Sequence, residues 1–372
     1  MHIVFVLRGY PTEADPYQPF SRELISQIAK NGVKCSVIAP QSVTRAIKHK
    51  VPIRKTFWKD IIDKDISVDI YQPLFVTTST LSIKCFKDQR LSAAKKAIKC
   101  IKDKIDVVYG HFWDMGVLAA KITENVPVYV GCGEAYIDKI FERFSNADLE
   151  LLRSKLSGVI YVSTNAYKEA CRLELHKGER YLIAPNGYNP LAFSPMNRDE
   201  CRSKLGLPND SFIVSFVGSF DDRKGVYRLI EAVKDYHDIK LLLIGRGADI
   251  PKSDQILFSG SLPHEKIVTY LNASNVFVLP TQAEGCCNAI VEAIACGLPI
   301  ISSNGEFNDD ILDDTNSIRI DPNNMDDIRK AILDIRDNVE LRQNLENGSK
   351  TRANNLSLEH RASIILDFMS RN

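Results

Sequence analysis

Short runs of apolar residues alternate with amphipathic segments along most of the chain. The first run, IVFVL at 3–7, is followed by a helical pattern over 20–31 and by a second apolar run at 34–40. Strands of a parallel sheet are buried on both faces, so they read as continuous apolar runs with helices between them. The alternation therefore predicts an α/β protein with doubly wound parallel sheets. Further strands are expected at 106–111, 126–131 and 158–163, and further helices at 115–123 and 164–175.

A second series of the same kind follows a segment rich in Pro, Asn and Gly. This segment, APNGYNPLAFSP at 184–195, is typical of a connector. The 372 residues also exceed the roughly 250–300 at which single cores stop growing, so we expect two lobes with a binding cleft between them. The second series comprises strands at 212–218, 240–245, 256–260, 276–280 and 299–302, and helices at 225–236, 263–273 and 288–296.

The distribution of charge is more informative than its total. The net charge of +1 argues against a nucleic-acid partner held by a global positive field. Residues 41–104, however, contain fifteen Lys or Arg and six Asp or Glu, so this segment carries +9. Its region 41–60 is less regular and combines basic residues with Phe57 and Trp58. An anionic membrane surface would attract such a region, and a solvated loop explains it equally well.

The cysteines and the apolar runs bear on the compartment. Nine cysteines form an odd number without C-x-x-C spacing, which favours a reducing environment. The first apolar run has only five residues, and no run approaches the ~18–20 that a membrane span needs. We therefore expect a cytoplasmic protein, with peripheral attachment to the inner membrane face as an alternative.

The strongest local signal is TQAEGCCNAIVEAIACGLPII at 281–301. A strand end is followed by the loop Gly285–Cys286–Cys287–Asn288, which leads into a helix. The unpaired N–H groups and the dipole at a helix N-terminus favour a phosphate. Glu284 and Glu292 flank this anion site, and Glu292 lies one turn inside the helix, where its carboxylate could accept hydrogen bonds from a ribose. The combination predicts a sugar-nucleotide site.

A second signal is VGSFDDRKGVYRLIEAV at 217–233. A strand ends at Gly218, and the basic pair Arg223–Lys224 precedes Gly225 and a helix. Cations beside a diphosphate would stabilise its charge as it departs. The alternative is a surface turn with a solvated lysine.

The order of these motifs resembles the retaining glycosyltransferases of the GT-B fold, in particular family 4 (glycosyl transferases group 1), over almost the whole chain. This resemblance implies two Rossmann-like lobes facing a central cleft: an acceptor-side lobe at 1–187 and a nucleotide-sugar lobe at 188–355. A C-terminal helix at 356–372 is expected to pack back on the first lobe. The matching elements are Glu284 and Glu292 with Gly297 and Pro299, Lys224–Gly225, Pro185–Asn186–Gly187 with Phe193, and Gly245–Arg246–Gly247.

The resemblance also implies roles for individual residues. Glu292 would bind the ribose, Glu284 the donor sugar and Lys224 the diphosphate, and Glu284 and Lys224 are expected to take part in catalysis with His111. The turn at 260–264 would read the base near Leu262. The remaining residues expected on the donor side are Gly9, Ser219, Arg223, Arg246, Gly285, Cys286, Cys287 and Asn288.

Two residues of the first lobe are expected on the acceptor side. His111 matches the histidine of the family that lies near the anomeric carbon, although it could instead cap the following helix. Glu134 follows a first-lobe strand and either faces the acceptor or belongs to a solvated loop. The sequence also departs from the family pattern: Ser219 stands where an arginine is common, and the loop at 8–20 has only Gly9 in place of paired glycines.

The resemblance implies a retaining transfer of a hexosyl or N-acetylhexosaminyl group from a nucleotide sugar, with UDP preferred over GDP. The acceptor would be a saccharide or lipid-linked saccharide in cell-surface polysaccharide or glycan synthesis. No cofactor and no metal are expected, and the D-x-D at Asp63–Asp65 lies in a charged stretch. A nucleotide-sugar epimerase and a non-catalytic nucleotide-binding scaffold are the alternatives. A nicotinamide dehydrogenase is disfavoured because Gly245–Arg246–Gly247 lacks a third glycine.

Overall fold

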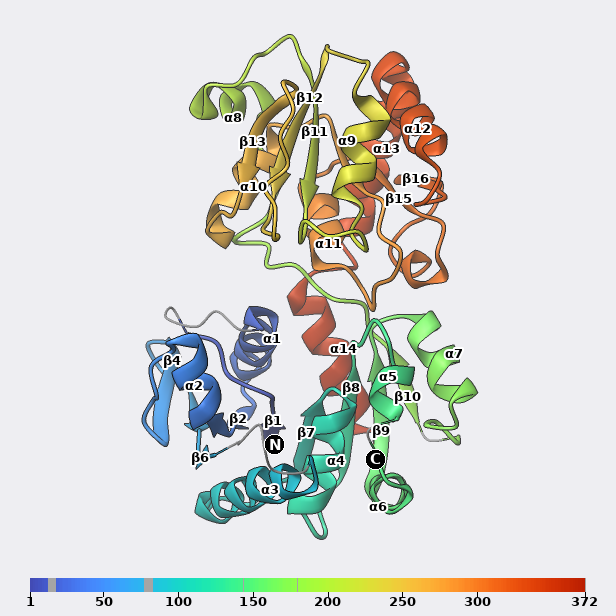
Figure 1. Cartoon of the computed structure of the whole chain (residues 1–372). Helices are drawn as coiled ribbons and strands as arrows, with labels where there is room; N and C mark the ends of the chain where they lie inside the picture. The colour runs from blue at the N-terminus through green and yellow to red at the C-terminus, as the bar shows by residue number, and fades with distance from the viewer. Residues whose placement is uncertain (13–17, 77–82, 143, 179, 372) are drawn as a thin grey trace. The chain divides into compact units, whose positions relative to one another are not determined.

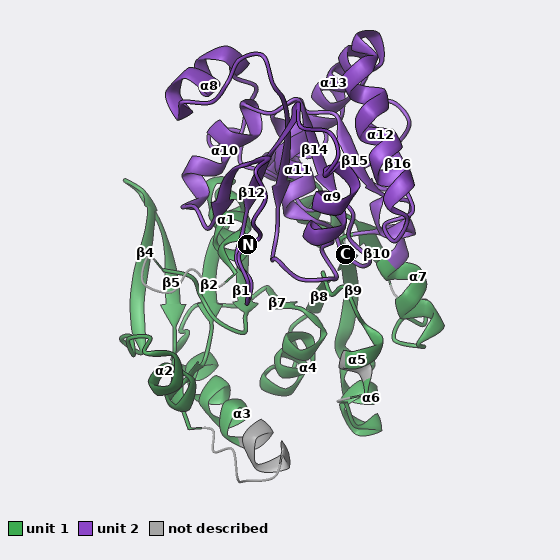
Figure 2. Cartoon of the chain, turned by 45° about the horizontal axis from the view of Figure 1, so that its top comes forward, with its two compact units in different colours: residues 1–162, 166–184, 362–372 green, residues 163–165, 185–361 purple. Residues whose placement is uncertain are grey.

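The structure, a computed structural model, describes residues 1–12, 18–76, 83–142, 144–178 and 180–371. Part of the loop at 8–20, which departs from the family pattern in its glycines, lies outside the described residues. The chain divides into two compact units (Figure 2). Unit 1 comprises Met1–Val162, Ala166–Ala184 and Ala362–Asn372, and unit 2 comprises Ser163–Asn165 and Pro185–Arg361.

Unit 1 contains an eight-stranded sheet in the order β10-β9-β8-β7-β1-β2-β5-β4 (Figure 1). All neighbouring strands are parallel except β4 and β5, which form an antiparallel pair at one edge. The strands are β1 (His2–Val6), β2 (Lys34–Ile38), β4 (Phe57–Asp63), β5 (Ile66–Tyr71), β7 (Val107–His111), β8 (Val128–Cys132), β9 (Leu156–Tyr161) and β10 (Tyr181–Ile183), and β3 (Gln41–Ser42) pairs separately with β6 (Leu74–Phe75).

The core of unit 1 lies on both faces of this sheet. Val4 and Val6 of β1 belong to one apolar cluster, and Ile3 and Phe5 belong to the other, because successive side chains of a strand point to opposite faces. Helices α3 (Ile83–Cys100), α4 (Trp113–Ile122), α6 (Asn146–Lys155) and α7 (Thr164–Arg172) contribute to the first cluster, and α1 (Pro19–Lys30) and α14 (Leu358–Ser370) to the second. The two short helices are α2 (Val43–His49) and α5 (Asp138–Phe141).

Unit 2 contains a six-stranded, wholly parallel sheet in the order β13-β12-β11-β14-β15-β16. The central strand β14 (Val276–Leu279) is fully buried. The other strands are β11 (Phe212–Val217), β12 (Ile239–Ile244), β13 (Ile256–Gly260), β15 (Ile300–Ser303) and β16 (Ser317–Ile320), and the helices are α8 (Arg198–Leu205), α9 (Val226–Val233), α10 (His264–Asn272), α11 (Asn288–Ala295), α12 (Met325–Asp337), α13 (Val339–Ala353) and the 3-10 turn η1 (Glu306–Asn308).

The predicted α/β class with two doubly wound lobes is confirmed. The expectation of an irregular region at 41–60 is wrong, because this region contains β3, α2 and most of β4. Strand β4, FWKDIID, lies at the sheet edge and buries only Asp60 fully. Its polar residues therefore interrupt the apolar run by which buried strands are recognised. Within the described residues, no helix is long and apolar enough to span a membrane.

Candidate functional site

The loops at the carboxyl edge of the unit 2 sheet are joined by backbone hydrogen bonds. The N–H of Gly218, after β11, donates to Ile244 O at 2.9 Å, and the N–H of Gly245, after β12, donates to Gly260 O at 2.9 Å. Any side chain at Gly245 would clash, since its Cβ would lie 1.8 Å from Gly218 O. Ligands of parallel α/β sheets bind at this edge, so these hydrogen-bonded loops are placed where a binding site is expected.

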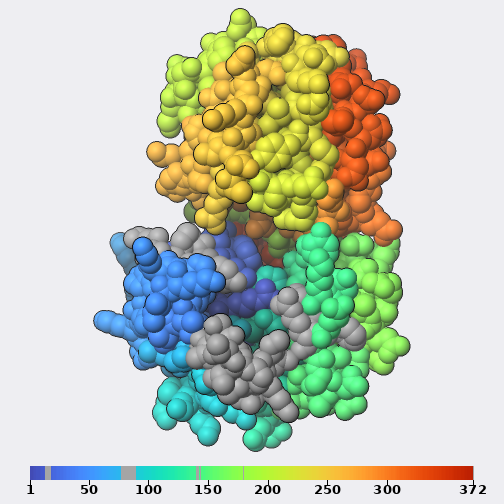
Figure 3. Space-filling view, in the orientation of Figure 1, coloured from blue at the N-terminus to red at the C-terminus, as the bar shows by residue number. Residues whose placement is uncertain are grey.

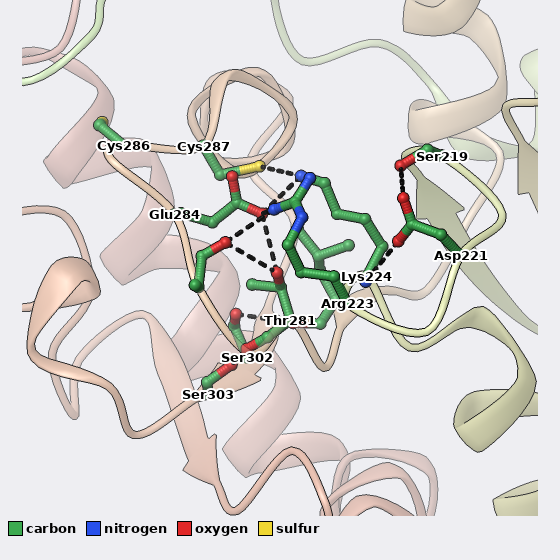
Figure 4. Close-up of polar contacts among 12 residues, drawn as sticks. Ser219, Asp221, Arg223, Lys224, Thr281, Glu284, Cys286, Cys287, Ser302 and Ser303 are labelled. Carbon is green, nitrogen blue, oxygen red and sulfur yellow. Dashed lines mark hydrogen bonds and ion pairs between the residues drawn. The ribbon is translucent and has the colours of Figure 1, made fainter. Parts of the chain in front are cut away.

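Two basic residues after β11 meet a glutamate after β14 (Figure 4). Oε1 of Glu284 contacts Lys224 Nζ at 2.6 Å and accepts hydrogen bonds from Arg223 at 2.9 Å and Thr281 Oγ1 at 2.8 Å. Arg223 also donates to Ala283 O at 2.7 Å. The side chains of Lys224 and Glu284 are only 12% and 11% exposed, so this is not the solvated surface turn that the sequence left open. Three residues predicted on the donor side are thus in direct contact.

The turn before α9 positions these cations. Asp221 accepts a hydrogen bond from the N–H of Lys224 at 2.8 Å and one from Ser219 Oγ at 2.5 Å. Gly225 begins the helix with a φ of +79°, and a Cβ there would lie 2.5 Å from Pro280 O. Glycine is therefore required both by the backbone angle and by the close approach of the strand end. Ser219 orients Asp221, whereas Arg223 supplies the second cation beside Lys224.

The charges around Lys224 favour an anion. Burial lowers the pKa of Lys224, but the charge of Glu284 and its hydrogen bond to the ammonium are among the effects that raise this pKa above its ordinary value, so the ammonium stays charged. Its Nζ lies 3.8 Å from Cys287 Sγ. Burial raises the pKa of Cys287 and raises that of Cys286 to about 12, so both thiols stay protonated at neutral pH and are poor nucleophiles.

The predicted helix start at Asn288 is confirmed, with Cys287 as the N-cap and no side-chain cap. Gly285, Cys286 and Cys287 are buried beside it. Asn186 holds this loop: its Nδ2 donates to Cys286 O at 3.0 Å and to Asn288 Oδ1 at 2.7 Å. Asn186 was predicted only as part of the P-N-G motif, and its role in positioning the α11 N-terminus was not predicted.

Glu292 lies one turn inside α11, as predicted. Its Oε1 is 2.9 Å from His264 Nε2, and the His264 ring packs 5.1 Å from the ring of Phe193. His264 begins α10, two residues after Leu262, so the turn expected to read the base adjoins the glutamate expected to bind the ribose. Arg246 is exposed in the loop after β12. His264 was not among the predicted residues, although it is the last residue of the turn at 260–264.

His111 and Glu134 lie in unit 1, at the ends of β7 and β8. Glu134 is buried and accepts hydrogen bonds from the N–H of Trp113 at 2.9 Å and of Gly133 at 3.1 Å. The solvated-loop alternative for Glu134 is therefore wrong. Burial raises the pKa of Glu134 to about 7.

Glu134 supplies the acceptor at the first N–H of α4. His111 is buried, and its ring lies 4.5 Å from that of Phe112 and 5.6 Å from that of Phe20. Gly9, also expected on the donor side, lines a cavity of unit 1.

The D-x-D segment lies at the turn between β4 and β5, where Asp63 Oδ1 accepts a hydrogen bond from the N–H of Lys64 at 2.7 Å. Asp63 and Asp65 are exposed. Across the part of the chain that the structure describes, no group of three or more His, Cys, Asp or Glu residues is arranged to hold a metal ion. That the activity needs no metal is still a prediction.

Comparison with known families identifies the family that most of unit 2 resembles. Residues 197–352 match the model of the family "Glycosyl transferases group 1". Residues 197–352 are therefore a group 1 glycosyltransferase domain. This group 1 domain includes Lys224, Glu284, His264 and Glu292, and every residue predicted on the donor side except Gly9. The two doubly wound units have the fold of the GT-B glycosyltransferases.

Relatives extend the similarity beyond the group 1 domain. The chain is 27% identical to the alpha-monoglucosyldiacylglycerol synthase of Acholeplasma laidlawii over 92% of this chain and 95% of the relative. It is 27% identical to the UDP-Gal:alpha-D-GlcNAc-diphosphoundecaprenol alpha-1,3-galactosyltransferase of Escherichia coli over 80% of this chain and 84% of the relative. Sucrose-phosphate synthase from Thermosynechococcus elongatus shares the fold, with a TM-score of 0.78, 20% identity, and coverage of 99% and 98%.

Proposed function

We propose that this chain is a glycosyltransferase that transfers a hexosyl or N-acetylhexosaminyl group from a nucleoside-diphosphate sugar, with UDP preferred over GDP, and retains the anomeric configuration. The observation that carries the proposal is the contact of Lys224 and Arg223 with Glu284 next to the N-terminus of α11. Glu292 and His264 stand one helical turn further on. Two cations and a helix N-terminus suit a diphosphate, and the two glutamates suit the hydroxyls on either side of it.

The arrangement suits a reaction that needs no enzymatic nucleophile. The bond between the anomeric carbon and the diphosphate oxygen breaks, and the acceptor oxygen bonds to the same face of that carbon. The acceptor proton passes to the departing diphosphate oxygen, so charge and atoms balance. Lys224, Arg223 and the α11 N-terminus would stabilise the charge that develops on the diphosphate. The protonated thiols of Cys286 and Cys287 offer no competing nucleophile.

The names of the relatives support a choice of substrates. The Escherichia coli relative is named for UDP-Gal and a diphosphoundecaprenol-linked acceptor, and the Acholeplasma laidlawii relative for a glucosylated diacylglycerol. Both names favour a lipid-linked or lipid acceptor over a protein acceptor. We therefore infer a saccharide or lipid-linked saccharide acceptor in the synthesis of a cell-surface glycan.

Calorimetric titration with UDP, GDP, ADP and NAD tests the donor site. We expect UDP to bind, and Glu292→Ala to weaken that binding about tenfold or more, because hydrogen bonds to a charged group contribute about 1.5–3 kcal/mol. Glu265→Ala, at an exposed position in the first turn of α10, is the matched control and should bind UDP as the parent does. Binding of NAD alone, or UDP binding that is indifferent to Glu292→Ala, would overturn the proposal.

Turnover assays separate the enzymatic alternatives. With a labelled UDP-sugar, a glycosyltransferase releases UDP at a rate that depends on added acceptor. An epimerase would convert the sugar of the donor without any acceptor and without releasing UDP. A non-catalytic scaffold would bind UDP and do neither. Acceptor-dependent release of UDP is the result we expect.

The edge of unit 1 formed by α2 and β4 is proposed to contact an anionic membrane surface. Ile47, Ile53 and Ile61 are 72%, 48% and 63% exposed, among the lysines of this segment. The segment is the blue surface on the left of Figure 3. Trp58 does not take part, since its Nε1 donates to Gln72 Oε1 at 2.8 Å and its ring packs on Tyr10.

Flotation with vesicles tests this contact. Each lysine or arginine near an anionic surface contributes about 1 kcal/mol, so vesicles containing phosphatidylglycerol should carry the protein at low salt and vesicles of phosphatidylcholine should not. Ile47→Ser should reduce flotation, whereas Val339→Ser, at an exposed apolar position of unit 2, should not. Equal flotation with both kinds of vesicle, or none, would contradict the proposal.

A further inference from the structure

Unit 1 contains a cavity of about 270 Å³ that the proposed donor site does not use. Its described lining comes from the loop after β1, the segment after β2, α2 with the residues that follow it, Gln72 and Phe75 around the start of β6, and α3. Among the described lining residues there are four arginines and no aspartate or glutamate: Arg8, Arg45, Arg54 and Arg90.

The arginines of this cavity are distinct from the basic residues around them. Residues 41–104 contain fifteen Lys or Arg, of which only Arg45, Arg54 and Arg90 are arginines. All three line the cavity, and no lysine is found among the described lining residues. Attraction to an anionic membrane makes no distinction between the two residue types. A planar guanidinium fork, however, binds a phosphate through two parallel hydrogen bonds, which an ammonium group does not.

Hydrogen bonds and an ion pair hold Arg54, Arg90 and Arg8 in place. Arg54 donates to Tyr10 O at 2.7 Å, and its own backbone is fixed by Gln41, which accepts from Arg54 N at 3.0 Å and donates to Arg54 O at 3.1 Å. Arg90 donates to Arg8 O at 3.3 Å, and Arg8 forms an ion pair with Asp114 at 2.9 Å. The cavity walls are thereby ordered before any ligand binds.

The position of the cavity is that of a ligand site. Gly9 and Ala39, both in the lining, follow the carboxyl ends of the adjacent parallel strands β1 and β2. Ligands of doubly wound sheets bind at this edge. The volume of 270 Å³ is slightly below the roughly 300–1,000 Å³ of small-molecule pockets, so it suits a phosphate with a single sugar unit rather than a long chain.

We propose that this cavity binds a phosphate group of the acceptor, through Arg45, Arg54 and Arg90. The inference rests on the proposed function, because it supplies the acceptor class of the same transfer. It narrows the acceptor to a molecule that carries a phosphate ester or diphosphate next to the sugar that is glycosylated. Two sources share this chemistry: a soluble sugar phosphate and the diphosphate of a lipid-linked saccharide.

Binding is measured with saturating UDP present, so that phosphate does not report on the cations of unit 2. The probes are glucose 6-phosphate, a short-chain prenyl diphosphate-linked N-acetylglucosamine, and uncharged glucose, at constant ionic strength. We expect one or both phosphate-bearing probes to bind and glucose not to. The probe that binds more tightly identifies the source.

Arg45→Gln and Arg90→Gln test the residues. Arg45 is exposed, so its substitution leaves the core intact. Each substitution should lower the affinity for the phosphate-bearing probe about tenfold or more, because hydrogen bonds between charged groups are lost. Lys48→Gln, which removes the same charge from the same helix outside the cavity, should not. Binding of UDP should be the same in all of these proteins.

The outcomes separate this inference from the proposed function. Phosphate-bearing probes that bind the two arginine variants as tightly as the parent, or that bind no better than glucose, overturn the inference even when UDP binds. Failure of UDP to bind overturns the proposed donor site, and the probe titrations repeated without UDP then still report on the cavity. An equal loss of affinity in Lys48→Gln would show that only long-range charge is involved and would also overturn the inference.

Discussion

Glu134 provides a quantitative test of the electrostatics of unit 1. Its carboxylate is buried behind the first turn of α4, where it accepts the N–H groups of Trp113 and Gly133. Glu134→Gln keeps an oxygen for the N–H of Trp113 and removes the ability to ionise. The substitution therefore isolates the cost of placing a negative charge at this buried position.

The magnitude follows from the pKa. Burial raises the pKa of Glu134 from its ordinary 4.5 to about 7, although the N–H of Trp113 and the charge of Arg8 both lower it. The folded chain then binds a proton more tightly than the unfolded chain, so the stability contributed by this group is present below pH 4.5 and is lost as the pH rises towards 7. Since one pKa unit corresponds to about 1.4 kcal/mol, the loss over the whole window is about 3 kcal/mol.

Urea unfolding at pH 5 and pH 8 measures this loss. The free energy of unfolding of the parent protein should fall between these pH values by about 2–3 kcal/mol more than that of Glu134→Gln. Hydrogen exchange of the α4 amides assigns the difference to unit 1, because a chain of two units need not unfold in one step. Glu124→Gln, which removes a charge from an exposed position of the same unit, should follow the parent.

A direct titration completes the test. Carbon-13 NMR of the glutamate carboxyls should show Glu134 titrating near pH 7. A midpoint near 4.5, or an equal fall in stability in the parent and in Glu134→Gln, would refute the argument from burial. Disruption of α4 in the variant at pH 5 would show that the hydrogen bonds of the cap matter more than its charge.

Three further substitutions test unit 2. Gly225→Ala should destabilise the protein by about 2 kcal/mol or more, because its φ is +79° and a Cβ would lie 2.5 Å from Pro280 O; an unchanged urea midpoint would contradict this. Asn186→Ala removes hydrogen bonds that hold the loop before α11, so calorimetry should show weaker UDP binding and urea unfolding a loss of about 1–3 kcal/mol. Lys224→Met should lower UDP affinity about tenfold or more while the fold persists, since Glu284 keeps its other donors; full UDP affinity would count against the role of the lysine.

The buried strands and the helices between them were predictable because burial on both faces leaves a continuous apolar run. Strand β14 is an example, since all of its residues are buried. The edge strand β4 and the helix α3 escaped prediction for the opposite reason. Residues of β4 alternate between exposed and partly buried positions, and α3 is rich in lysine. In both elements, polar residues interrupt the apolar pattern, so neither element could be identified from it.

The donor residues were predicted as two separate motifs, but their contact was not. Lys224 follows β11 and Glu284 follows β14, which are distant in the sequence and neighbours in the sheet. The order of strands in a parallel sheet depends on crossover connections, which local patterns do not specify. His264 escaped for the same reason, since 28 residues separate it from Glu292 and only the folded chain brings the two side chains together.

The cavity of unit 1 is a second arrangement that local sequence patterns do not predict. Its four arginines come from positions up to 82 residues apart, and the sequence revealed only that the segment 41–104 is basic. A charge total predicts attraction to anions in general. Only the fold distinguishes arginines gathered around one cavity from lysines spread over the surface.

Glu284 links the two halves of donor recognition. Its Oε1 contacts Lys224 Nζ and accepts hydrogen bonds from Arg223 and Thr281, and these contacts offset the cost of burying the charges. A diphosphate would compete for the two cations, and Glu284 would then keep Thr281 and gain room to accept hydroxyls of the donor sugar. Binding of the diphosphate and of the sugar would therefore depend on each other through this carboxylate. It follows that Glu284→Gln should lower the affinity for a UDP-sugar more than the affinity for UDP, because UDP lacks the hydroxyls that the released carboxylate would bind.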